Sequence, residues 1–140
     1  GEQRRDFVHV TDAVRANLFF YENQNIGGVY NVGTGVSQSF NDVAIAVINA
    51  CRDLDGESPL SLHEAVKDNL LTYFPMAAEL NGKYQSFTEA DMTKLRSVGF
   101  NSEPILVAEG VHDYASLIYQ DLKISTIEIP NQKSENRTER

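Results

Sequence analysis

Two neighbouring cations near the start of the chain have the type and spacing to bind an anion. Arg4 and Arg5 come just before an alternating stretch, Phe7 to Thr11, whose pattern predicts a short strand. Thr11-Asp12 ends that stretch with two favourable helix caps, so we expect the strand to turn directly into a helix. Guanidinium groups offer planar, paired donors to phosphate oxygens, and a strand would hold them in place. The sequence therefore predicts a site for a phosphorylated ligand.

A lysine and a tyrosine, Lys83 and Tyr84, stand together further along the chain. We expect a strand from Leu70 to Pro75 and a loop after it, so the pair would lie on exposed chain. Loops held by a rigid scaffold are where binding residues concentrate. Plain structural interpretations exist as well: Tyr84 as a solvated loop residue, and Arg5 as the partner of Asp6 or of a helix carboxylate in a surface salt bridge. The residues alone leave these alternatives open.

A glycine turn at Gly33-Thr34-Gly35 follows the predicted strand Val29 to Val32. A dinucleotide-binding turn would read G-x-G-x-x-G, but Ser37-Gln38-Ser39 occupies the place of the last glycine. An acidic residue at the end of a following strand is missing too. We therefore interpret the turn as structural rather than phosphate-binding and assign no cofactor-binding residue in this chain.

Composition and charge bound the function classes. With 140 residues the chain can bury a core, and its length predicts one domain. A formal net charge of −8 argues against a nucleic-acid surface, because phosphate backbones favour clustered cations. No apolar run approaches the roughly 18 to 20 residues of a membrane helix. The three histidines, His9, His63 and His112, have no metal-binding spacing, and the single Cys51 fits a reducing compartment.

The remaining pattern predicts helices joined by polar breaks. Ser39-Phe40-Asn41-Asp42 has the form of a capping box that opens a helix to about Leu54, with Cys51 among its inward positions. Further helices are expected from Asp12 to about Asn23, after Ser61 to about Asn69, after Thr88 with a stop at Gly99, and from Pro104 onward. Beyond Lys123 the sequence becomes a polar tail. His112 is expected to bind nothing.

Several motifs then carry a resemblance to a known family. Arg4 to Asp12 with its following helix, and Val29 to Gly35 before a second helix, resemble the carboxyl-terminal part of extended short-chain dehydrogenases/reductases, the NAD-dependent nucleotide-sugar epimerases and dehydratases. Residues 82–91, 95–100 and 107–111 are similar to the branch of that family that inverts C6 of ADP-glycero-manno-heptose in lipopolysaccharide synthesis. Ordered agreement of separate motifs over Arg4 to Tyr119 is more specific than any one of them. Residues 52–69 are not covered by it.

The resemblance implies an α/β fold that is incomplete here. Residues 1–123 would be the substrate-binding part of an extended Rossmann-type epimerase, and 124–140 a polar tail. One strand and one helix within 12–35 would belong to the dinucleotide-binding sheet, whose remainder lies in polypeptide upstream of Gly1, so this segment should be poorly covered. The expected partners are an ADP-sugar substrate, the missing amino-terminal dinucleotide-binding domain and further copies in a homo-oligomer, with no nucleic acid and no membrane. A cytoplasmic location is expected.

The resemblance also implies site residues. Arg5 corresponds to the arginine that contacts the substrate phosphates, Tyr84 to a tyrosine that contacts the sugar nucleotide, and Phe7 and Lys83 stand beside them. The family uses NADP or NAD with a Tyr-x-x-x-Lys pair, because an alcohol must lose a proton as hydride leaves. The pair Tyr119 and Lys123 has this spacing but lies in the last helix instead of upstream. No catalytic residue is therefore assigned, and the chain alone is expected to be inactive and to bind no cofactor.

Three hypotheses remain open from the sequence. The first is the substrate-binding part of a heptose-nucleotide epimerase. The second is part of another nucleotide-sugar epimerase or dehydratase. The third is a non-catalytic interaction module that uses the apolar faces of Asp12 to Asn23 and Val29 to Val32.

Overall fold

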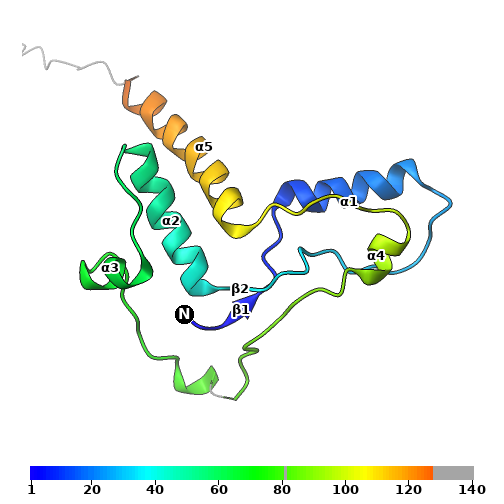
Figure 1. The fold of residues 1–140 in the computed structure, drawn as a ribbon, viewed down its shortest axis with the longest axis horizontal. Coiled ribbons are helices and arrows are strands. Elements are labelled where there is room, and N and C mark those ends of the chain that lie inside the picture. The colour runs from blue at the N-terminus through cyan, green and yellow to red at the C-terminus, as the bar shows by residue number, and fades with distance from the viewer. Residues whose placement is uncertain (81, 128–140) are drawn as a thin grey trace, which may run out of the picture.

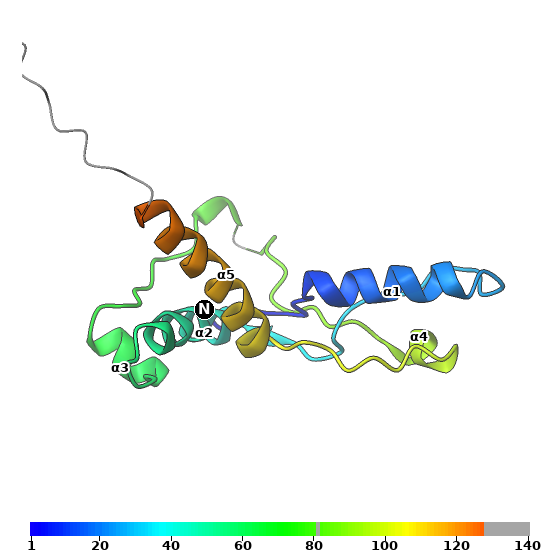
Figure 2. The same cartoon turned by 90° about the horizontal axis from the view of Figure 1, so that it is seen from above.

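Two groups of helices lie on either side of a short two-stranded sheet. The computed structural model describes residues 1–80 and 82–127. Figure 1 shows α2 (Phe40–Leu54), α5 (Val107–Ile127) and α3 (Leu62–Lys67) on one side of the sheet, and α1 (Val10–Glu22) with α4 (Thr93–Ser97) on the other. The view from above in Figure 2 shows the same separation. The two groups meet at β1 (Arg4–Arg5) and β2 (Gln38–Ser39).

The sheet is shorter than the sequence predicts. β1 pairs antiparallel with β2, with Arg4 opposite Ser39 and Arg5 opposite Gln38. On the other side of β1, the amide of Arg4 donates to the carbonyl of Ser86 at 2.8 Å. The carbonyl of Arg4 accepts from the amide of Thr88 at 3.1 Å. The predicted strand Phe7 to Thr11 is wrong, because no described segment pairs with it.

α1 begins at Val10, two residues before the expected start. His9 is its N-cap: the ring Nδ1 accepts from the amide of Thr11 at 3.3 Å. The expected Thr11-Asp12 cap is therefore wrong. Asp12 instead lies buried in the first turn, where its carboxylate accepts from the amide of Ile105 at 2.7 Å and from Arg15 at 2.9 Å. α1 is thereby joined to the segment that leads into α5.

α2 and α5 pack side by side and run in the same direction away from the sheet. The capping box of Ser39 and Asp42 that opens α2 is confirmed. α5 begins at Val107 instead of Pro104 and continues to Ile127, past the expected boundary at residue 123. Gly110 lets α5 lie close to His9, since a Cβ at residue 110 would lie 2.9 Å from Cδ2 of His9. Cys51 is exposed, so its assignment to the core is wrong.

The segment between α2 and α5 is mostly irregular. The capping signal at Ser61 is confirmed, and α3 ends at Lys67. The strand expected from Leu70 to Pro75 is wrong: this stretch has no strand pairing, and the loop after it holds only a 3₁₀ turn, η1 (Ala78–Leu80). α4 begins at Thr93, later than expected, and ends before Gly99, whose φ of +101° confirms the predicted stop.

The buried core is small and much apolar surface is exposed. The described apolar side chains that are buried are few: Ala16, Ala50, Ala65, Met92, Leu95 and Val107. The expected strand Val29 to Val32 has no strand pairing here, and Val29 is 86% exposed. α1 also exposes apolar side chains along one face: Val10, Val14, Leu18 and Tyr21. The poor coverage expected for this segment is therefore observed. Across the described ranges, no helix has both the length and the hydropathy to cross a membrane.

Candidate anion-binding site

Arg5 and Tyr84 lie together in the structure. The guanidinium carbon of Arg5 is 5.1 Å from the centroid of the Tyr84 ring, which is a cation–π contact. Nη1 of Arg5 donates to the carbonyl of Arg4 at 2.7 Å, and Nη2 donates to the carbonyl of Gln85. Among the described residues no carboxylate lies within ion-pair distance of Arg5, so the alternative interpretation of Arg5, a surface salt bridge, is not observed. The guanidinium is held in place while its charge is not neutralised.

The path of the chain explains why these two residues meet. Residues 86–88 run alongside β1 through the backbone bonds of Arg4 described above. Tyr84 and Gln85 come just before this segment, so the pairing places them next to Arg5, although Gln85 is 80 positions away in sequence. A guanidinium has five donors, and two of them are used here. The others can bind an anion.

Phe7 and Lys83 contribute less to this site. Phe7 contacts Phe40 edge to face, with ring centroids 5.5 Å apart, and lines a different apolar hollow with Val43 and Tyr114. Lys83 is exposed, and its backbone amide donates to the carbonyl of Leu80 at 3.0 Å. The structure therefore brings Arg5 and Tyr84 together, but it does not place Phe7 with them.

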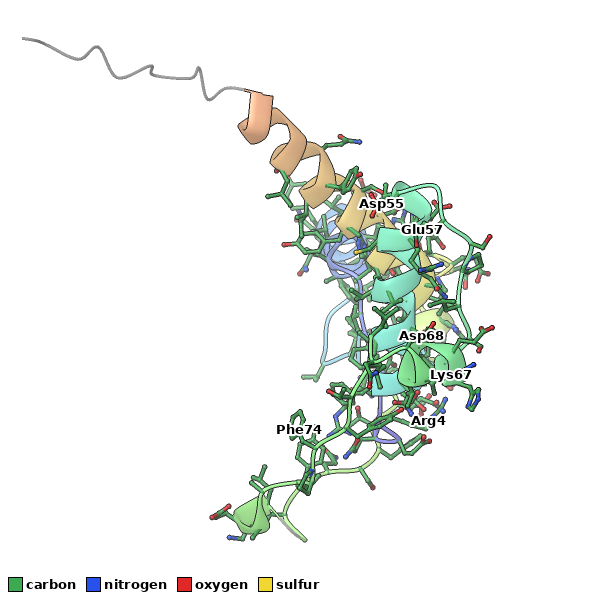
Figure 3. All side chains as sticks on the ribbon, turned by 90° about the vertical axis from the view of Figure 1, so that its left-hand side faces the viewer. Arg4, Asp55, Glu57, Lys67, Asp68 and Phe74 are labelled. Carbon is green, nitrogen blue, oxygen red and sulfur yellow. The ribbon has the colours of Figure 1, made fainter. Side chains whose placement is uncertain are left out.

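An apolar groove opens beside Tyr84. It has a volume of about 480 Å³, which is within the range of roughly 300–1,000 Å³ for small-molecule sites. Aromatic and sulfur-containing side chains dominate its wall: Phe40, Tyr73, Phe74, Met76 and Tyr84. Tyr73 donates to the buried side chain of Asn41 at 2.9 Å, which ties the loop to the start of α2. Phe74 is 89% exposed. Figure 3 shows it on the connection between α3 and η1.

Asp6 is a residue whose role the sequence does not predict. Its Oδ1 accepts from the amide and hydroxyl of Thr34 at 2.7 and 2.6 Å, and its Oδ2 accepts from the amides of Gly35 and Ala90 at 3.0 Å each. The carboxylate therefore occupies the amides of the glycine turn that a ligand phosphate would need. The amides of Thr34 and Gly35 are bonded within the chain, and the interpretation of this turn as structural stays a prediction. Nothing local in the sequence signals these partners.

The hydrogen bonds to Asp6 make the free energy of unfolding depend on pH in the acidic range. Burial raises the pKa of Asp6, but the bonds from Thr34, Ala90 and Gly35 together outweigh burial and hold the pKa below its ordinary value. The folded carboxyl thus binds a proton less readily than the unfolded one. Its contribution to stability is complete above about pH 4 and is lost as the pH falls through the lowered folded pKa.

We expect Asp6→Asn to flatten the acid limb of the free energy of unfolding, measured by urea titrations between pH 2 and pH 6, with each pH compared with the unsubstituted chain. Hydrogen bonds also lower the pKa values of the exposed Asp91 and Glu64, so part of the slope should remain. An unchanged slope in Asp6→Asn would contradict this assignment.

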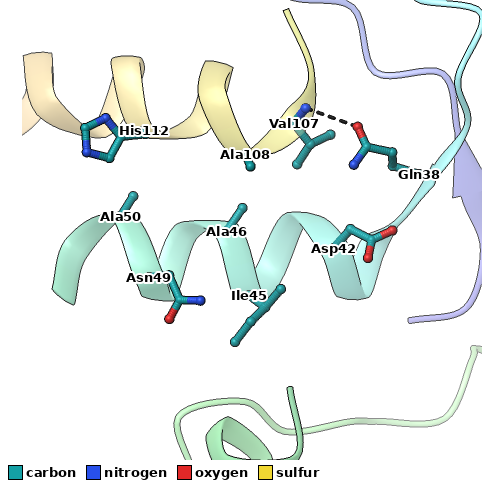
Figure 4. Close-up of a pocket in the computed structure, with 9 residues that line it drawn as sticks. All are labelled: Gln38, Asp42, Ile45, Ala46, Asn49, Ala50, Val107, Ala108 and His112. Carbon is teal, nitrogen blue, oxygen red and sulfur yellow. Dashed lines mark hydrogen bonds between the residues drawn. The ribbon is translucent and has the colours of Figure 1, made fainter. Parts of the chain in front are cut away.

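Other polar clusters have internal partners. A hollow of about 360 Å³ lies between α2 and α5, where Gln38 accepts from the amide of Val107 at 3.1 Å (Figure 4). His112 contacts Asp53 at 3.0 Å, so it has a side-chain partner within the chain, while the expectation that it binds no ligand stays a prediction. Tyr119 donates to Asp55 at 2.7 Å. In the part of the chain that the structure describes, no three His, Cys, Asp or Glu side chains gather as metal ligands.

One comparison with known proteins bears on these residues. Residues 1–33 match the sequence profile of the NAD dependent epimerase/dehydratase family. The match includes Arg5, Asp6, α1 and the first glycine of the turn, but it ends before Tyr84. It supports an epimerase-type or dehydratase-type enzyme whose complete form uses NAD or NADP.

Proposed function

We propose that this chain is the substrate-binding part of a nucleotide-sugar epimerase, in which Arg5 binds the phosphates of an ADP-sugar. The observation that carries the proposal is the Arg5–Tyr84 pair: a fixed guanidinium, without a carboxylate partner among the described residues, stacked on a phenol at 5.1 Å. Planar donors of this kind match phosphate oxygens in pairs. The finer assignment is inversion of C6 in ADP-glycero-manno-heptose for lipopolysaccharide core synthesis.

The groove beside Tyr84 supports a ligand larger than phosphate. Its wall is largely apolar, and Tyr84 both lines it and contacts the guanidinium of Arg5. A ligand with a charged centre and flat or apolar ends can place its charged centre on Arg5 and one of its ends in the groove. Nucleotide sugars have this division of charge. Lys83 precedes Tyr84 directly in the sequence and lies on exposed chain.

The exposed apolar segment supports a missing partner domain. Residues 12–35 leave Val14, Leu18, Tyr21 and Val29 exposed, the first three of them along one face of α1, and apolar side chains gathered on one face are typical of an interface. We propose that the amino-terminal dinucleotide-binding domain covers it in a complete protein that forms homo-oligomers in the cytoplasm. That domain would supply NAD or NADP, which provides hydride transfer. The residues of this chain bind and orient the substrate.

The experiment is binding of ADP-glucose to the 140-residue chain and its Arg5→Ala variant, measured by isothermal titration calorimetry. We expect at least about a tenfold loss of affinity in the variant, because a charge-assisted pair of hydrogen bonds contributes about 1.5–3 kcal/mol. Lys67→Ala is the charge control, since it removes one exposed cation from α3.

Equal affinities of Arg5→Ala and the unsubstituted chain would overturn the role of Arg5. Titration with UDP-glucose and dTDP-glucose separates the heptose-nucleotide assignment from another epimerase or dehydratase. A preference for either of these over ADP-glucose would favour the latter. No binding of any sugar nucleotide would favour a non-catalytic interaction module.

A further inference from the structure

Three segments far apart in sequence converge on one carboxylate. Asp6 follows Arg5 directly, and its two oxygens accept from Thr34, Gly35 and Ala90. Gly33 is required at this junction for space: a Cβ there would lie 2.4 Å from Cβ of Ala90 and 2.5 Å from Oδ2 of Asp6. The φ of Gly33 is not in the left-handed region, so close approach explains this glycine better than turn geometry does.

The junction lies between the two sides of the proposed site. The glycine turn ends the segment assigned to the dinucleotide-binding sheet, whereas Arg5 and the segment from Tyr84 to Ala90 belong to the substrate side. β1 has only two residues, so its pairing fixes little of the chain beyond Arg5. The next fixed point after Arg5 is the carboxylate of Asp6. After residues 86–88, the chain is held first by Glu89, whose carboxylate accepts from the amide of Ser37 at 2.9 Å, and then by the amide of Ala90.

We propose that Asp6 is a positioning residue that sets the Arg5–Tyr84 pair and joins it to the glycine turn. It acts through the backbone on both members of the pair and touches no substrate. This inference rests on the proposed function for its role in ligand binding, but its structural part stands without a ligand. The backbone bonds of Arg4 to residues 86–88 and the bond from Arg5 to Gln85 remain when the bonds to Gly35 and Ala90 are lost. The proposal is that these remaining bonds alone do not keep the ring of Tyr84 against the guanidinium of Arg5, so the two separate.

The test is the effect of the Tyr84 ring current on the Arg5 side-chain resonances, measured by NMR on the 140-residue chain. Tyr84→Leu gives the reference position without the ring. In Asp6→Asn the amide oxygen can still accept from Thr34, but its NH₂ cannot accept from Gly35 and Ala90. We expect the upfield displacement seen in the unsubstituted chain to be lost in Asp6→Asn, so that the Arg5 resonances move to the reference position.

A stability-matched control separates positioning from general destabilisation. Asn49→Ala removes two bonds to the backbone of Leu60, at 3.0 and 2.8 Å, and should leave the Arg5 resonances in place. If Asp6→Asn does not fold, Gly33→Ala takes its place, because its methyl group pushes Asp6 and Ala90 apart. Unmoved Arg5 resonances in the folded Asp6 or Gly33 variant overturn the proposal, as does an equal displacement in Asn49→Ala.

Binding of ADP-glucose in the same samples distinguishes failure of the proposed function from failure of the positioning role of Asp6. If the unsubstituted chain does not bind while Asp6→Asn still loses the ring-current displacement, the proposed function fails and the positioning role stands. If the unsubstituted chain binds and Asp6→Asn retains both its affinity and its displacement, the positioning role fails and the proposed function stands.

Discussion

Leu95→Ala should lower the free energy of unfolding by about 3 kcal/mol, because it deletes the largest fully buried apolar side chain of the described part. Leu95 is 1% exposed on α4, and Phe100 just beyond α4 contacts Phe19 of α1 with ring centroids 5.5 Å apart. The core here is small, so neighbouring side chains offer little to fill the space left behind. Urea titration followed by circular dichroism measures the loss.

A matched substitution shows whether the loss comes from burial. Leu117 lies on α5 and is 61% exposed, so Leu117→Ala deletes the same atoms from a solvated position. We expect it to change the free energy of unfolding by about 0.5 kcal/mol or less. Similar losses in both variants would mean that Leu95 is not packed as the structure shows it.

The sequence predicted local features well, because their signals lie within a few residues. The capping boxes Ser39 to Asp42 and Ser61 to Glu64 each join positions three apart, and both are present in the structure. Gly99 likewise ends α4 with a left-handed φ. A cap satisfies backbone amides from its own turn, so tertiary contacts rarely override it.

The predicted strands failed for the opposite reason. Phe7 to Thr11, Val29 to Val32 and Leu70 to Pro75 have suitable residue types, but a strand needs a partner, and the described chain supplies none for them. The carbonyl of Val29 instead accepts from Nζ of Lys94 at 2.7 Å. For Val29 to Val32, the exposed side chains are consistent with the proposed partner in a missing domain.

The candidate site was predictable only in part. Arg5 could be found from its charge on an acidic background, although the strand predicted beside it at Phe7 to Thr11 does not form and Arg5 itself lies in β1. Its contact with Tyr84 depends on residues 86–88 lying beside β1, which no local pattern shows. Asp6 was missed as a site residue for the same reason, since its partners are 28, 29 and 84 positions away.

Asp12→Ala should lower the free energy of unfolding by about 2 kcal/mol. Asp12 is 6% exposed, and its carboxylate accepts from the amide of Ile105 at 2.7 Å, 93 positions away in the sequence. Its removal leaves a partly buried amide without a partner, which costs about 1–3 kcal/mol. It also takes a negative charge from the first turn of α1. Hydrogen exchange at Ile105, with urea titration, measures both effects.

Two further variants divide this cost. Asp12→Asn keeps an oxygen that can accept from Ile105, so it should lose less stability than Asp12→Ala and keep the Ile105 amide protected. Arg15→Ala breaks only the ion pair with Asp12. Because the Arg15 side chain is 44% exposed, this should lower the free energy of unfolding by about 1 kcal/mol or less. If Asp12→Asn and Asp12→Ala destabilise equally, charge rather than the bond to Ile105 holds α1 against the approach to α5. That outcome would contradict the assignment.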